Sequence, residues 1–187
     1  MEKIINFIER NISGKKVFLL FILTNLVYVF MLALTIPKVM EFSNGLRLLD
    51  MMPTGYDFNY VTELLTSLGD IGRKTYLTNQ LPVDMIYPFL FGISYCLLSG
   101  YFLKKINRLK NPFIYLCLLP LIAGLFDYLE NFGIIVMLNN YTEITPLLVK
   151  ITSVFTIIKS IATSLYFISL VVLLIVFTIK KINKKTS

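Results

Sequence analysis

The stretch Phe126-Asp127-Tyr128-Leu129-Glu130-Asn131 lies inside an apolar run, Pro112 to Leu138, that is long enough to cross a bilayer. Asp127, Glu130 and Asn131 stand at positions i, i+3 and i+4, which places their side chains on one face of a helix. Carboxylates within a membrane span are costly, so they face the protein interior or a water-filled cavity. This stretch therefore predicts a membrane helix whose polar face looks into a bundle.

The composition favours a membrane protein with a single transmembrane domain over residues 1–187. Of the 187 residues, 56% are hydrophobic and only 16% are charged, which is less polar than a soluble domain of this size. The formal net charge of +7 comes from 18 Lys+Arg against 11 Asp+Glu. Because the basic residues lie beside the apolar runs, membrane topology explains them better than nucleic-acid binding does. We expect the lipid bilayer, and not nucleic acid, as the partner.

Histidine does not occur in the sequence. This removes the commonest zinc ligand and the usual proton shuttle near neutral pH. We therefore predict neither a metal site nor a cofactor. A magnesium or calcium site made only of carboxylates is the alternative that stays open.

Four apolar runs predict four membrane spans and an all-α, four-helix bundle. The expected spans cover about residues 17–37, 83–103, 112–138 and 152–179. Apolar residues at helical spacing within residues 1–14 predict a further short amphipathic helix that lies on the membrane face.

The polar section 41–82 predicts a partly helical cap over the ends of the spans. Asp57 is placed to cap the helix that follows it, and Gly69 is placed to end that helix. A second short helix is expected from Ile71 to Gln80. The dipeptide Leu81-Pro82 should then break the chain before the next span.

Lysine and arginine residues predict the orientation of the spans. They are concentrated at both ends of the chain and in the loop 104–110. By the positive-inside rule, both termini and this loop are cytoplasmic, whereas the cap and the short loop 139–146 lie outside. The first span has no clear small-x-small cleavage site, which predicts an uncleaved anchor and a multi-pass protein of the cell membrane.

Helix geometry places charged residues from three different spans at one depth. Measured from the cytoplasmic end of its own span, Asp84 lies about 30 Å up, Asp127 about 24 Å and Lys159 about 31 Å. The hydrocarbon layer is about 30 Å thick, so these groups gather in its outer third. The sequence thus predicts an acidic chamber near the non-cytoplasmic surface.

The candidate ligand-binding pocket consists of the polar side chains expected at this depth: Asp84, Tyr87, Asp127, Glu130, Asn131, Lys159, Arg73 and Tyr76. Lys159 and the loop residue Arg73 would act as counter-ions to the acids, and no residue is assigned a catalytic role. In a second interpretation, the same charges hold the helices in register. In a third, Asp84 and Lys159 simply reach water along the membrane surface.

Three motifs add a resemblance to this interpretation: Gly72-Arg73-x-x-Tyr76-Leu77, Gln80-Leu81-Pro82-x-Asp84-x-x-Tyr87-Pro88 and Phe126-Asp127-x-x-Glu130-Asn131. Together they resemble a group of small bacterial four-span membrane proteins that has no assigned activity, over about residues 49–159. A more distant likeness of architecture is to the EXPERA-type membrane proteins, which include sterol isomerases and sigma-2-like receptors. The lack of histidine departs from the sterol isomerases, whose sites include one.

The leading functional hypothesis is recognition of an amphiphilic, lipid-like small molecule. Its polar or cationic head would contact Asp84, Asp127 and Glu130, and its tail would lie between the spans. Whether the chain is also an enzyme stays open; a protonated acid donating and an ionised one accepting would suit isomerisation or hydrolysis. The alternatives are a proton- or cation-coupled transporter subunit, for which a homo-oligomer is expected, and a membrane scaffold that binds a partner protein.

Overall fold

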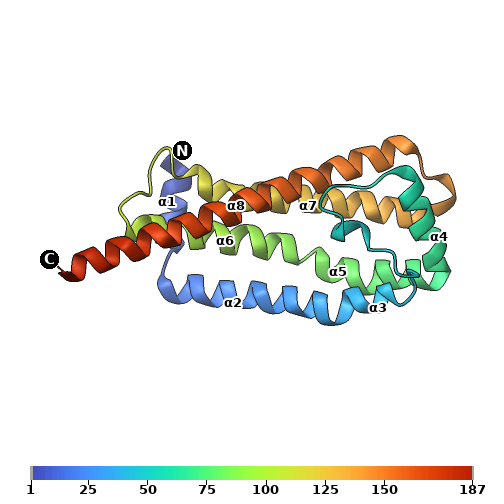
Figure 1. The fold of residues 1–187 in the computed structure, drawn as a ribbon, viewed down its shortest axis with the longest axis horizontal. Helices are drawn as coiled ribbons and strands as arrows, with labels where there is room; N and C mark the ends of the chain where they lie inside the picture. The colour runs from blue at the N-terminus through green and yellow to red at the C-terminus, as the bar shows by residue number, and fades with distance from the viewer. Residues whose placement is uncertain (1, 187) are drawn as a thin grey trace.

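The computed structural model describes the backbone of residues 2–186 and the side chains of residues 5–183. Within this part, every regular element is a helix. Four helical segments are long and apolar enough to span a membrane: Gly14–Met40, Phe58–Lys105, Tyr115–Asn139 and Pro146–Asn183. The all-α, four-helix bundle predicted from the sequence is confirmed (Figure 1).

The helices follow one another with short breaks. The α-helices are α1 (Glu2–Asn11), α2 (Gly14–Phe30), α3 (Ile36–Met40), α4 (Phe58–Thr75), α5 (Leu81–Asp84), α6 (Tyr87–Lys105), α7 (Tyr115–Asn139) and α8 (Pro146–Thr186). The π-helical turns η1 (Met31–Thr35) and η3 (Tyr76–Gln80) join α2 to α3 and α4 to α5, and the 3-10 turns are η2 (Leu49–Met51) and η4 (Tyr141–Glu143).

The packing order of the long helices leaves two of them apart. Helix α2 packs on α6, α6 on α7, and α7 on α8, whereas α2 and α8 do not pack closely on each other. Much of α2 is exposed, including Leu26 and Leu34. In a membrane bundle such a surface faces lipid, so α2 is a peripheral helix held mainly by α6.

The cap over one end of the bundle forms as its turn residues predict. The Asp57 side chain accepts a hydrogen bond from the Tyr60 backbone N at 2.8 Å, which caps the start of α4. Gly69, at φ +57° and ψ −174°, interrupts the helical backbone where a stop was expected. Leu48, Leu49 and other buried apolar side chains of this section then pack with residues of α7 and α8 in one core.

The dipeptide Leu81-Pro82 does not break the chain, contrary to the expectation from its sequence. The backbone runs helically through η3 into α5, because Pro82 falls in the first turn of α5, where the missing N–H is not needed. The break comes instead at Met85 and Ile86, directly before α6. This break places Asp84 at a helix end inside the bundle.

Both described chain ends lie at the same end of the bundle as the α6–α7 loop, and the cap lies at the opposite end (Figure 1). Ile8 of α1 is fully buried in a cluster with Leu103 and other apolar side chains. Glu9 forms an ion pair with Lys104 at 3.6 Å, and Lys180 Nζ donates to the Ile106 carbonyl at 3.0 Å. These contacts join α1 to the end of α6, and α8 to the start of the α6–α7 loop.

Candidate functional site

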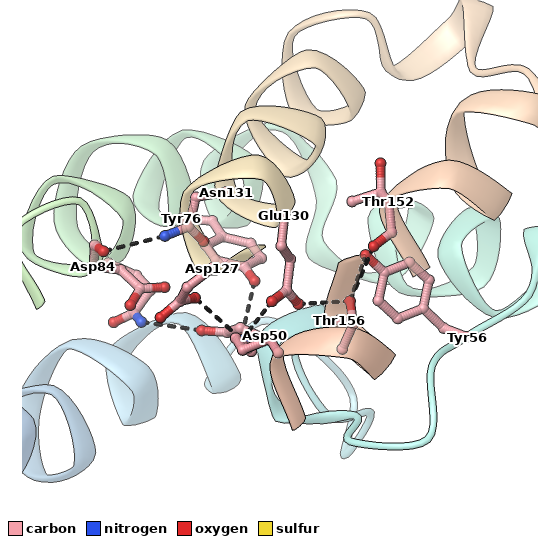
Figure 2. Close-up of polar contacts among 11 residues, drawn as sticks. Asp50, Tyr56, Tyr76, Asp84, Asp127, Glu130, Asn131, Thr152 and Thr156 are labelled. Atoms are coloured by element: carbon pink, nitrogen blue, oxygen red, sulfur yellow. Dashed lines mark hydrogen bonds and ion pairs between the residues drawn. The ribbon is translucent and has the colours of Figure 1, made fainter. Parts of the chain in front are cut away.

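Two acids of α7 share one lysine of α8. Asp127 and Glu130 are buried, as their spacing on one helix face predicts. Lys159 Nζ lies 3.2 Å from Asp127 Oδ1 and also forms a close ion pair with Glu130 Oε2. Figure 2 shows the carboxyl groups of Asp127 and Glu130 pointing into the same region. The ammonium group of Lys159 therefore compensates two carboxyl groups at once.

Glu130 has a second partner that sequence reasoning missed. Thr156 Oγ1 donates to Glu130 Oε1 at 2.8 Å and lies 3.5 Å from the phenol oxygen of Tyr56. Tyr56 belongs to the loop before α4, and its backbone N donates to Ser153 Oγ at 2.9 Å. Burial and the nearby Glu130 carboxyl group raise the pKa of the Tyr56 phenol above its usual range, which keeps the phenol neutral.

Asp50 reaches the same region from the cap. Its carboxyl group accepts hydrogen bonds from Tyr76 OH at 3.0 Å and from Gln80 Nε2 at 3.2 Å. Gln80 Oε1 in turn accepts a short hydrogen bond from Thr35 Oγ1. The cap and the first span are thus tied through buried polar groups to the same cluster.

Asp84 differs from the other acids because its carboxyl group has no hydrogen bond or ion pair among the described residues, although the residue is only 4% exposed. The Asp84 carboxyl group is repelled by those of Asp127 and Asp50 and attracted at longer range by the Lys159 ammonium group. The Asp84 backbone carbonyl accepts a hydrogen bond from Asn131 Nδ2 at 3.1 Å, which fixes the position of the residue. Asn131 Oδ1 itself is buried without a hydrogen-bond partner.

A cavity of about 630 Å³ adjoins this cluster. Its polar part is lined by Asp50, Asp84, Asp127 and Lys159. Its remaining walls are mainly aromatic, apolar or hydroxyl-bearing and include Tyr28, Leu32, Tyr87, Phe91, Tyr95, Ser160, Thr163, Ser164 and Phe167. The cavity therefore has a charged part and a largely apolar part, as a site for an amphiphile requires.

The walls of the cavity come chiefly from α2, α6 and α8. Three residues that line the cavity are themselves 41–45% exposed: Tyr28 of α2, Leu32 of η1 and Phe167 of α8. Since α2 and α8 do not pack closely on each other, the cavity reaches the lipid-facing surface between them.

The structure brings most of the predicted pocket residues together. Asp84, Tyr87, Asp127 and Lys159 line the cavity. Three more of the predicted pocket residues lie in the buried polar network beside the cavity without lining it: Glu130, Asn131 and Tyr76.

Arg73 is not part of this cluster, which corrects its expected role as a counter-ion. It forms a short ion pair with Asp70, donates to the Leu65 carbonyl at 2.7 Å and lies over the Tyr141 ring at 4.0 Å. The turn at Gly69 brings Arg73 back onto its own helix, so its charge is compensated by Asp70 and not by the acids at the cavity.

Asp50 is the cavity residue that sequence reasoning missed most clearly. It stands between two apolar pairs, Leu48-Leu49 and Met51-Met52, in an otherwise polar section. Leu48 and Leu49 are fully buried, and they carry Asp50 inward with them. A lone acid flanked by apolar residues in a loop was therefore the available signal.

Within residues 2–186, no group of three or more His, Cys, Asp or Glu side chains is arranged to hold a metal ion. The side chains that line the cavity bring carboxyl, ammonium, hydroxyl and aromatic groups. The chain matches no family model, no curated protein and no solved structure, so the resemblance to small four-span bacterial proteins stays a prediction.

Proposed function

We propose that this chain binds a lipid-like amphiphile in the cavity between α2 and α8. The observation that carries the proposal is the division of this cavity into a part lined by Asp50, Asp84 and Asp127 and a mainly aromatic part that reaches the lipid-facing surface. The polar head of the ligand lies against the acids, and its tail lies along the aromatic wall.

The apolar part of the cavity supports binding of a hydrocarbon tail. Tyr28 stacks on Tyr87 with ring centroids 5.4 Å apart, and Phe91 continues this row at 5.8 Å from Tyr87. Packed rings keep a wall rigid, and they offer a large apolar surface to an alkyl chain. A ligand dissolved in the bilayer reaches this wall without crossing water.

The charges at the two ends of the bundle support an orientation with both termini in the cytoplasm and the cap outside the cell membrane. Lys15, Lys16, Lys104 and Lys105 lie on or beside the ends of the spans opposite the cap. By the positive-inside rule this end stays in the cytoplasm. The acidic part of the cavity then lies in the outer leaflet.

A single introduced tryptophan tests the proposal. The chain contains no Trp, so the Phe91→Trp variant in detergent has one indole emitter, at a cavity wall residue that is 5% exposed. The probes share a bromoundecyl chain, whose bromine quenches indole fluorescence, and carry a trimethylammonium, hydroxyl or sulfate head. We expect at least one of them to quench Phe91→Trp with a saturable titration curve.

Phe102→Trp is the matched control, because Phe102 lies on the same helix and packs on Phe177 outside the cavity. Its quenching should rise only in proportion to the probe dissolved in the micelle. Both variants should unfold in circular dichroism within a few degrees of the unchanged protein. Saturable quenching that is equal in both variants, or that occurs in neither, contradicts ligand binding in this cavity.

A further inference from the structure

We infer that Asp84 recognises the ligand and that the head group of the ligand is a cationic ammonium. This inference rests on the proposed function, because it names the chemical class that the cavity between α2 and α8 selects. It follows from the distribution of partners among the buried acids.

Three of the four buried or cap-derived acids at this site already have partners. Lys159 compensates Asp127 and Glu130, and Thr156 adds a hydrogen bond to Glu130. The Asp50 carboxyl group accepts hydrogen bonds from both Tyr76 and Gln80. Side chains of the protein therefore already supply hydrogen bonds or a counter-ion to these three carboxyl groups.

Asp84 is the acid whose carboxyl group receives no hydrogen bond and no ion-pair contact from the described part of the chain, and the Lys159 ammonium acts on it only at longer range. It is 96% shielded from solvent, since its exposed fraction is 4%, and it lines the cavity. A buried carboxyl group with no hydrogen bond and no ion in contact with it is unfavourable, whether it is protonated or ionised. A cation bound in the cavity beside Asp84 removes this penalty, which makes Asp84 the natural contact for the head group.

The ionisable groups around the cavity also favour a cationic head group. Four carboxyl groups, of Asp50, Asp84, Asp127 and Glu130, surround the single ammonium group of Lys159. Lys159 is held by two of these acids, so it is not available to attract an anionic head. A low-dielectric site with more acidic than basic groups favours a cation over an anion.

The aromatic residues beside Asp84 suit an ammonium group in particular. Tyr87 lies three residues after Asp84 and is also in the cavity wall, with Tyr28 stacked on it. A cationic ammonium is attracted to the faces of such rings. An alcohol head of similar size gains neither this attraction nor the charge of Asp84.

The three bromoundecyl probes test the inference in the Phe91→Trp protein. We expect the trimethylammonium probe to bind at least tenfold more tightly than the alcohol, and the sulfate to bind most weakly. Asp84→Asn in the same background should reduce the affinity for the ammonium probe to within about threefold of the alcohol. Glu143→Gln, which removes an equal charge from an exposed residue outside the cavity, should leave the preference unchanged.

Two results overturn the inference while the proposed function stands. One is saturable binding of the ammonium and alcohol probes with equal affinity to the protein that retains Asp84. This result overturns the inference even if the Asp84→Asn variant does not fold. The other is a preference for ammonium that survives Asp84→Asn in a folded protein. Lack of saturable quenching by all three probes is a different result, which contradicts the proposed function itself.

Discussion

Lys159 Nζ lies 3.2 Å from Asp127 Oδ1, and this ion pair joins α8 to α7 inside the bundle. The same ammonium group also contacts Glu130, whose side chain is fully buried. Removal of the lysine charge would leave two carboxyl groups without compensation in a low-dielectric region. The contact network thus makes Lys159 a structural residue, whatever the cavity binds.

We therefore predict that Lys159→Met destabilises the protein by about 3–5 kcal/mol, the usual effect of breaking a buried ion pair from one side. The measurement is the free energy of unfolding in mixed micelles. Lys150→Met is the matched control, since Lys150 is an exposed lysine of the same helix. A change that is equally small in both variants would mean that the buried acids do not depend on Lys159.

The depth argument could find this ion pair from the sequence because it used only the helical rise and the lysines that mark the span ends. Asp127 and Lys159 line one cavity because α7 and α8 carry them to one level, and Asp84 reaches the same level although a break separates α5 from α6. Arg73 and Asp50 lie in the cap, where no periodicity fixes the direction of the chain. Their positions depend on the turn at Gly69 and on the burial of Leu48 and Leu49.

Asp50→Asn should destabilise the protein although the side chain keeps its size. Tyr76 OH and Gln80 Nε2 donate to different oxygens of the Asp50 carboxyl group. An asparagine can accept only one of these bonds, so one buried donor loses its acceptor, at a cost of about 1–3 kcal/mol. Thermal unfolding followed by circular dichroism measures this loss.

The control for Asp50→Asn is Asp57→Asn, at a helix N-cap where asparagine is as suitable as aspartate. This second variant should unfold within about 0.5 kcal/mol of the unchanged protein, the usual range for a neutral surface substitution. Equal stability of the two variants would show that the bonds from Tyr76 and Gln80 contribute nothing measurable.

Gly69→Ala should also be destabilising, for a reason that lies in the backbone and not in packing. A Cβ atom at this position would meet no heavy atom within 4 Å, but the residue has φ +57° and ψ −174°. This conformation is nearly restricted to glycine, and another residue there costs about 1–3 kcal/mol. Gly14→Ala at the start of α2, where a Cβ would lie at an ordinary 3.5 Å from Tyr101, should be close to neutral in the same unfolding measurement.

The contact between α6 and α7 provides the last prediction. A Cβ atom on Gly124 of α7 would lie 2.7 Å from the Pro88 carbonyl oxygen, which is backbone and cannot turn aside. Gly124→Ala must therefore push the two helices apart, at a cost of about 1–3 kcal/mol. The same shift would widen the cavity wall, because Ala123 and Asp127 flank Gly124 on α7.

Gly92 is the comparison on the other side of this contact, since a Cβ there would lie 3.4 Å from the movable Leu121 side chain. Gly92→Ala should therefore cost less than about 1 kcal/mol, and the difference between the two variants isolates the close backbone approach. Unfolding in mixed micelles gives both values. If Gly92→Ala proves the more harmful of the two, then α6 and α7 do not approach each other at Gly124 as closely as the structure places them.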